Sequence, residues 1–460
     1  MKRNATIHEA FGFDDVLLLP TETNVKPADV STKTRLTKTI ELGIPLISAG
    51  HDNVTESAMA IALAHLGGLG IIHDNMPLGK QVEEVRRVKR AEGNLVLNPI
   101  TVSPDASVAE AMDLMTTYKI SGLPVVEQST QKVAGIITHR DIRFFEDYAK
   151  PVSELMTKEV ITVKGPVDSG TAKRMLHQHR IEKLVVIDDQ GRCTGLVTVK
   201  DIEKLSQYPD AARDMHGRLR VGAAVGTGKD AFDRAAAMTD AGLDVAFIDV
   251  PQAHTRDALG TVSRIRQQRT NEVQIVAGNV ATVEAARALM DAGADAIKIG
   301  IGASCASASR RISGVGVPQM TALLNVIEQC AMLNIPVIVD GGIKNSASLA
   351  KALGAGAESV IIDGLFAGTD EAPGTVVYQD GRAYKVVNPA AKSQHRAQPS
   401  PSAHDPYSFD EDAVDTSTPY CGSVSNIVQQ LIGGLKHAMA YTGSQDIRAL
   451  IENAEFVRIK

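Results

Sequence analysis

The chain has 460 residues, of which 44% are hydrophobic and 22% charged, and its formal net charge is −6. These proportions are typical of a soluble globular protein with two or three domains, or with one barrel that carries an insertion. The acidic balance gives no reason to expect nucleic acid or an anionic membrane as a partner. No apolar run approaches the ~20 residues that a membrane-spanning helix needs.

The cysteines are widely spaced and form no CxxC pair; they are Cys193, Cys305, Cys330 and Cys421. This pattern argues against a structural zinc site and against a disulfide framework. The N-terminal residues lack the apolar core of a secretory signal. We therefore expect a cytoplasmic protein.

Eight short apolar runs end in Gly, Asp or Asn, and Ala-rich segments with apolar residues three and four apart separate most of them. Near-continuous apolar runs of this length are typical of parallel strands, which are buried on both faces. Their alternation with helices predicts an α/β fold, a (β/α)8 TIM barrel rather than an open doubly wound sheet, with its active site beyond the carboxyl ends of the strands. The runs cover residues 44–53, 68–75, 219–226, 244–251, 273–280, 296–303, 336–342 and 359–366.

Residues 92–208 interrupt this alternation with an internal repeat. The stretch "GLPVVE…VAGIITHRDI" is echoed by "KLVVID…CTGLVTVKDI", in copies at about 92–148 and 151–208. Each copy is too small to bury a core alone, so we expect the two to pack as a pair. The copies resemble CBS domains, inserted between a first barrel part (1–91) and a second part (209–460).

Each copy ends in a T-x-x-D sequence, namely Thr138 with Asp141 and Thr198 with Asp201. The resemblance to CBS domains implies that these residues hold the ribose or phosphate of a purine nucleotide, and carboxylate and hydroxyl groups suit that role. Alternatively, each Thr caps a helix whose first turn contains the Asp.

A polar segment rich in Pro and Ser lies at about residues 386–418. A structureless stretch of this length inside an enzyme domain is usually a mobile flap or disordered.

Several motifs carry a resemblance to the inosine-monophosphate dehydrogenase / GMP reductase family over nearly the whole chain. They include "GVGVPQ" (314–319), "VDGGI" (339–343) and "LFAGTDEAPG" (365–374), in the family's order and beside the paired insertion. The resemblance implies purine nucleotide chemistry with NAD and assembly into a homo-oligomer, a tetramer or octamer.

The resemblance also assigns roles to individual positions. On the cofactor side it implies Asp249, Asn279, Gly300, Gly302 and Arg310. On the substrate side it implies Ser48, Asp340, Gly341 and Gly342, with Asp363 and Gly364 at the phosphate position.

The loop "GIGASCASASR" (300–310) departs from the family's G-x-G-P-G-S-x-C-T-T-R. Aligned without gaps, Ser307 stands at the position of the nucleophilic Cys, and Cys305 stands at the position of a phosphate-binding Ser. An alcohol without an adjacent base is a much poorer nucleophile than a thiolate, and Cys305 is the fallback candidate. Ser304 replaces a loop glycine, which argues against the monovalent cation (potassium) site that the resemblance would place at residues 302, 304 and 307.

Three other departures lie outside that loop. Asp363-Gly364 replaces a Gly-Ser pair, and a carboxylate about 4 Å from a phosphate costs several kcal/mol unless it pairs with a neighbouring Lys or Arg. In the flap, Pro406-Tyr407 replaces an Arg-Tyr pair whose Arg activates water. His51 replaces a Met that packs against the purine, and it is either a new acid, base or ligand or an exposed histidine without function.

These departures leave three interpretations. The thiolate, the phosphate pair and the flap arginine are coupled parts of one mechanism, so their joint absence favours a chain that does not catalyse the standard NAD-dependent conversion of IMP to XMP. Such a chain would be a nucleotide-sensing pseudoenzyme beside a catalytic paralogue, or a diverged enzyme with a different substrate, for instance one without a phosphate. The alternative is an active NAD-dependent IMP dehydrogenase.

Overall fold

A computed structural model describes most of the chain and divides it into two compact units. The first unit contains residues up to 89, 210–212 and those from 219 onward, and the second contains 90–209 and 213–218. The described residues are 7–91, 96–97, 99–118, 120–165, 167–199, 202–203, 207–268, 272–303, 308–387 and 417–459.

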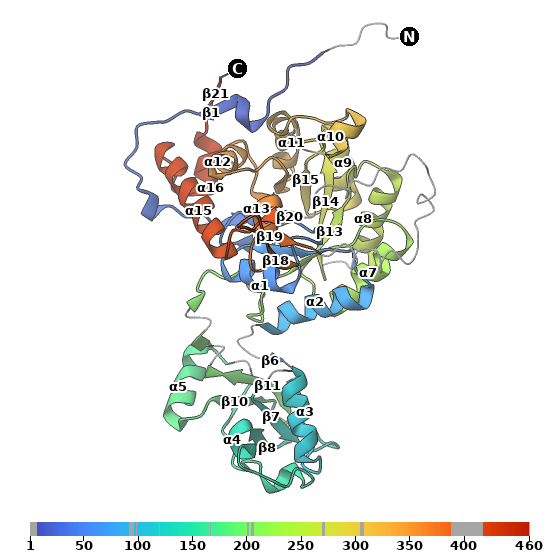
Figure 1. The fold of residues 1–460 in the computed structure, drawn as a ribbon, viewed down its shortest axis with the longest axis vertical. Coiled ribbons are helices and arrows are strands. Elements are labelled where there is room, and N and C mark those ends of the chain that lie inside the picture. The colour runs from blue at the N-terminus through green and yellow to red at the C-terminus, as the bar shows by residue number, and fades with distance from the viewer. Residues whose placement is uncertain are drawn as a thin grey trace. The chain divides into compact units, whose positions relative to one another are not determined.

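The first unit is built on a closed barrel of eight strands, each parallel to its neighbours (Figure 1). These are the eight strands predicted from the apolar runs, so the TIM-barrel prediction is confirmed. In barrel order they are β12 (Gly222–Ala224), β13 (Val245–Asp249), β14 (Gln274–Val280), β15 (Ala296–Ile299), β16 (Val337–Asp340), β17 (Ser359–Ile362), β4 (Leu46–Ser48) and β5 (Leu69–Ile72).

Most residues of the barrel strands are apolar because both faces of the strands are buried. Every residue of β5, β15 and β17 is buried. With no Trp in the chain, the interior is filled by Phe247 and by branched aliphatic side chains such as Ile71, Val276 and Ile338. This packed interior leaves the strand ends as the place for a site.

The pairing of β17 with β4 closes the barrel between segments that are far apart in the sequence. Ile362 lies opposite Ser48, and the N–H of Ala49 donates to the carbonyl of Ile362 at 3.0 Å. The residues that follow these two strands are therefore neighbours at the rim.

Helices surround the barrel strands (Figure 1). They are α1 (Ser57–His65), α2 (Leu78–Ala91), α7 (Lys229–Asp240), α8 (Arg256–Gln268), α9 (Val283–Ala292), α10 (Ala308–Ser313), α11 (Gln319–Met332), α12 (Ser346–Gly354), α13 (Gly364–Ala367), α15 (Val424–Tyr441) and α16 (Ile447–Asn453). Local signals set their ends: in α9, the Thr282 hydroxyl accepts from the N–H of Ala285, and Gly293 ends the helix with a φ of 108°.

Three small sheets complete the first unit. Their strands are β1 (Val16–Leu18) with β21 (Phe456–Arg458), β2 (Thr34–Arg35) with β3 (Glu41–Leu42), and β18 (Thr375–Gln379), β19 (Arg382–Val386) and β20 (Ser417–Pro419) in one sheet. In the last of these, Val386 pairs with Ser417. Both ends of the segment between β19 and β20 are thus held side by side.

The second unit contains two copies of one arrangement, a helix followed by an antiparallel strand pair. Each copy has its own apolar cluster, one around Leu123 and Ile137 and the other around Leu184 and Val197. The elements are β6 (Val96–Leu97), α3 (Val108–Tyr118), β7 (Gly122–Val126), β8 (Val133–Thr138), α4 (His139–Ile142), β9 (Thr162–Lys164), α5 (Ser169–His179), β10 (Lys183–Ile187) and β11 (Cys193–Thr198).

Candidate active site at the barrel mouth

Charged side chains gather at the carboxyl ends of the barrel strands. Asp249 ends β13 and Asp340 ends β16, while Asp363 follows β17 and His51 lies in the loop after β4. Because all eight strands are parallel, these ends share one rim. We call this rim the barrel mouth.

One side of the mouth is organised by Lys298, at the centre of β15. Its side chain is fully buried, and its ammonium group donates to Asp249 at 2.7 Å and to Asp340 at 2.5 Å. The two carboxylates are 23% and 24% exposed, so each keeps one side toward the mouth. A buried ammonium that bridges two carboxylates holds both in fixed positions.

These contacts also set the charges of Lys298 and Asp340. Burial acts to lower the pKa of Lys298, but Asp249 and Asp340 outweigh it, and the net pKa lies above the usual value. Burial acts to raise the pKa of Asp340, but Lys298, His51 and Asn279 outweigh it, and the net pKa is lowered. Lys298 is therefore charged and Asp340 ionised at neutral pH.

Asn279, in β14, has a side-chain oxygen that accepts no hydrogen bond from the described residues. Its side-chain N–H donates to Asp340 at 3.2 Å. Its Oδ1 atom is buried and has no hydrogen-bond partner among the parts of the chain that the structure describes. A buried acceptor without a partner is costly in a protein interior, and at a strand end it suits a donor from a bound molecule.

The other side of the mouth holds an ion pair between His51 and Asp363. Nδ1 of His51 lies 3.3 Å from Oδ1 of Asp363, and the side chains are 59% and 49% exposed. Asp363 occupies the N-cap position of α13 but makes no side-chain capping bond. The sequence left open whether Asp363 would face the phosphate position or pair with a neighbouring Lys or Arg; in the structure its partner is a histidine.

The carboxylate changes the charge of the imidazole. Asp363 raises the pKa of His51 to about 9 against the lowering effect of partial burial, and Asp249 and Asp340 add to the rise. His51 is therefore a cation at neutral pH and offsets the negative charge of Asp363.

Glycines let the backbone approach the mouth closely. A Cβ atom at Gly300 would collide with the carbonyl oxygen of Asp340, and Gly302, with a φ of 63°, packs on Gly316. Gly341 and Gly342 also have positive φ values.

The remaining predicted mouth residues are placed differently. Ser48 is fully buried, and its Oγ atom accepts from the hydroxyl of Thr55, so it exposes no donor. Gly364 begins α13, and Arg310 is exposed on α10. The predicted positions Ser304, Cys305, Ser307 and Tyr407 lie outside the described residues.

Lys298 is the functional residue that the sequence interpretation missed. The signal was present, because Lys298 is the only charged residue inside the apolar run "AIKIGIG" (296–302). A lone ammonium in a strand buried on both faces requires carboxylate partners.

In the second unit, Thr138 and Asp141 contact each other. The Asp141 carboxylate accepts from both the N–H and the hydroxyl of Thr138, at 2.7 Å each, and forms a capping box for α4. The helix-capping interpretation therefore describes this pair. Thr198 ends β11, and Asp201 lies outside the described residues.

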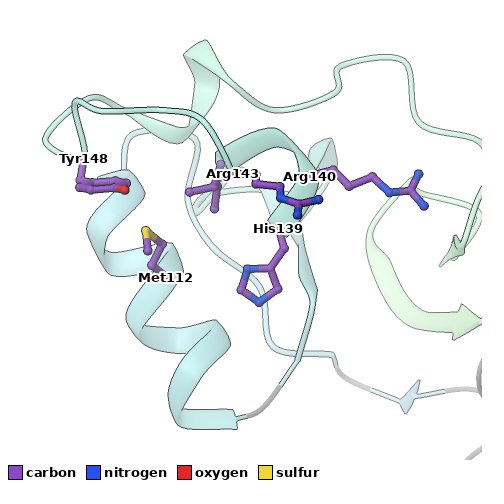
Figure 2. A pocket seen from close by; sticks show the side chains of 6 residues that line it. Met112, His139, Arg140, Arg143 and Tyr148 are labelled. Atoms are coloured by element: carbon purple, nitrogen blue, oxygen red, sulfur yellow. The ribbon is translucent and has the colours of Figure 1, made fainter.

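A cavity of 340 Å³ lies beside α4. Figure 2 shows Tyr148 and Met112 on one side and His139 and Arg143 on the other, while Arg140 points away from them. Arg140 instead pairs with Glu182. Thr138 and Asp141 do not line the cavity, which is walled by Met112, His139, Arg140, Ile142, Arg143 and Tyr148.

The described residues contain no group of three or more His, Cys, Asp or Glu side chains arranged to hold a metal ion. Among them, no helix has the length and apolar character needed to cross a membrane.

Comparison with known proteins gives full-length matches. Residues 10–460 match the IMP dehydrogenase / GMP reductase domain. Inosine-5′-monophosphate dehydrogenase of Aquifex aeolicus is 46% identical, covering 98% of this chain and 94% of that protein, and the Bacillus subtilis protein of the same name is 45% identical with 98% and 93% covered.

A solved structure of a GMP reductase also matches this chain over its full length. The crystal structure of GMP reductase from Trypanosoma brucei in complex with guanosine 5′-monophosphate superposes with a TM-score of 0.89 at 34% identity, covering 100% of this chain and 97% of that one. The barrel, the charged residues at its mouth and these matches agree. This chain belongs to the IMP dehydrogenase / GMP reductase family.

Proposed function

We propose that this chain is an NAD-dependent oxidoreductase that converts inosine 5′-monophosphate (IMP) to xanthosine 5′-monophosphate (XMP) at the barrel mouth. The observation that carries the proposal is the Lys298 network, which holds the carboxylates of Asp249 and Asp340 in place at the strand ends and lowers the pKa of Asp340. Relatives named IMP dehydrogenase match over almost their whole length. These findings support an active enzyme better than the pseudoenzyme that the loop substitutions had favoured.

The mouth can bind both substrates through its own polar groups. The Asp340 carboxylate can accept from the ribose hydroxyls of IMP, and the positive φ of Gly341 and Gly342 lets the backbone come close. Asp249 and the free acceptor of Asn279 fit the nicotinamide riboside part of NAD, which offers ribose hydroxyls and a carboxamide N–H. When bound, NAD supplies a hydride acceptor.

The His51–Asp363 pair weakens the sequence argument against phosphate binding. An isolated carboxylate at position 363 would repel a phosphate. Paired with a protonated imidazole 3.3 Å away, it contributes little net charge. The purine, in turn, would lie against His51, where the family has a Met.

The proposal is tested by incubating the full chain with IMP and NAD and following NADH and XMP. We expect both products in equal amounts. Ser307→Cys should raise kcat by at least about tenfold, because a thiolate attacks the purine C2 more readily than an alcohol or water does. Turnover of GMP with NADPH but not of IMP with NAD would contradict the proposed direction.

A second candidate is a diverged enzyme that acts on a substrate without a phosphate. One observation favours it: within the described part of the chain, the three mouth carboxylates Asp249, Asp340 and Asp363 pair with two cations, Lys298 and His51. Inosine in place of IMP in the same assay distinguishes the two candidates. Binding of purine nucleotides without any NADH would instead indicate a pseudoenzyme, for which a catalytic paralogue would be the partner.

We also propose that the second unit binds purine nucleotides as a CBS pair. His139 and Arg143 beside the 340 Å³ cavity give it a basic wall. ATP or GTP should raise the melting temperature, and Arg143→Ala, which removes a basic side chain from the cavity wall, should reduce the shift. If no purine nucleotide changes the melting temperature, the second unit does not bind these ligands and acts only as a structural spacer. Assembly into a tetramer or octamer stays a prediction of the resemblance.

A further inference from the structure

We infer that His51, oriented by Asp363, is the proton acceptor for the water that adds to C2 of the purine. The inference deepens the proposed function and rests on it. It gives a role to two residues at which this chain departs from its family, and it explains how C2 can be hydroxylated with an alcohol at position 307.

The placement of the pair is the first argument. His51 and Asp363 are far apart in the sequence, but β4 and β17 pair and bring them together at the mouth. Both replace residues that cannot titrate in the family, a Met and a Gly. Two separate substitutions therefore produce one contact, an imidazole held by a carboxylate.

The unused ring nitrogen is the second argument. Nδ1 of His51 faces Asp363, and no residue in the described part of the chain hydrogen-bonds to Nε2. Asp363 contacts the imidazole although the N-cap position would let it cap α13. A carboxylate that holds Nδ1–H leaves Nε2 as the basic nitrogen, the arrangement of general bases in hydrolases.

The charges of the mouth are the third argument. Asp363 from β17 is the strongest influence on His51, and it raises the pKa to about 9 together with Asp249 from β13 and Asp340 from β16. Lys298 from β15 is already engaged by the last two carboxylates. Asp74, after β5, is itself held toward its neutral form by burial, which raises its pKa. The result is a strong base, of which about 1% is neutral at pH 7.

The step is an addition of water across the C2=N3 bond of hypoxanthine. The water oxygen forms a bond to C2, the π pair of C2=N3 moves to N3, and the water proton passes to Nε2 of His51. N3 takes this proton back from Nε2, so the addition of water balances and His51 is regenerated. The hydrate carries at C2 the hydrogen that would leave as a hydride to bound NAD, and the cation that remains would lose one proton to Nε2 of His51 to give XMP.

Chemical rescue tests the role of the imidazole. His51→Ala should lower kcat by at least about 100-fold, and added imidazole should restore a substantial part of it, because a free base can fill the space. The matched control is His437→Ala, an exposed histidine of α15 away from the mouth, which should keep wild-type kcat. Loss of activity in His51→Ala without any rescue, in a folded variant that still binds IMP, would overturn the inference.

The pH dependence gives a second readout. The logarithm of kcat should rise with unit slope up to a pKa near 9. Asp363→Asn should move that pKa downward and lower the plateau about tenfold, because the weaker base is also less well oriented. A profile unchanged in His51→Gln or Asp363→Asn would contradict the role.

Histidine-labelled protein gives a readout that needs no turnover. The NMR titration of His51 should have its midpoint near pH 9 in the free protein and near its ordinary value in Asp363→Asn. A midpoint near 6.5 in the unaltered chain would overturn the inference even if IMP is oxidised. If the chain forms no NADH from IMP, the proposed function fails. If it forms NADH but the midpoint lies near 6.5, only the role of His51 fails, so the two failures are distinguishable.

Discussion

On one side of the barrel mouth, Lys298 is fully buried between two carboxylates, whereas on the other side His51 and Asp363 are 59% and 49% exposed. On the buried side, the resemblance matches Asp249 and Asp340 to family positions, whereas on the exposed side His51 and Asp363 depart from them. Desolvation explains the difference. A change of one buried charge leaves its partners without compensation, while water can solvate either member of the exposed pair.

Lys298→Met removes the cation on the buried side of the mouth, and we expect it to have the largest effect on stability and turnover. It leaves Asp249 and Asp340 close together without a cation, so we expect the free energy of unfolding to fall by about 3–5 kcal/mol and turnover to disappear. Urea denaturation measures the change. Lys344→Met is the matched control, because Lys344 pairs with Asp14 on the surface, and it should shift stability by less than about 0.5 kcal/mol. Equal effects of the two variants would remove the distinction between the buried and exposed sides.

Asp363→Gly should change ligand selection on the exposed side. Removing the carboxylate leaves His51 as an uncompensated cation when it is protonated, so we expect IMP to bind about tenfold more tightly, equivalent to about 1.4 kcal/mol. Inosine, which has no phosphate, should bind as before. Calorimetric titration of both ligands measures the difference, and an equal gain for inosine would show that charge is not the cause.

The smallest expected effect is on stability as a function of pH. The folded-state pKa of His51 lies above its unfolded value, so the pair stabilises fully below about pH 6.5 and its contribution is lost as the pH rises through about 9. Because both side chains are half exposed, we expect less than about 1 kcal/mol. The difference in melting temperature between wild type and His51→Met should therefore shrink between pH 6.5 and 9.5 or so, and a constant difference would contradict the pairing.

The sequence predicted the barrel well because burial on both faces makes every strand an apolar run that ends at a polar residue. Through the family motifs it pointed to Asp249, Asp340 and Asn279, which the structure places in strands β13, β16 and β14, and their roles stay predictions. It missed Lys298, because a charged residue was not expected inside a buried, mostly apolar strand. It also treated His51 and Asp363 as two separate losses, because their contact depends on how the first and last strands of the barrel meet.

In the second unit, the T-x-x-D sequence was compatible with two different interpretations. Thr138 and Asp141 fit a helix cap and a nucleotide site equally well, because both uses need the same hydroxyl and carboxylate at the same spacing. The structure has the capping contacts. The repeat predicted the two copies, but only a bound nucleotide would test the other use.

The pairing of Val386 with Ser417 in the sheet of β18, β19 and β20 has a consequence for evolution. Since this hydrogen-bonded anchor sets where the intervening stretch leaves and returns, insertions and deletions within it leave the barrel's register unaltered. Closing a loop twice as long costs only about 0.6 kcal/mol more. Relatives of this chain can therefore differ in the length of that stretch at little thermodynamic expense.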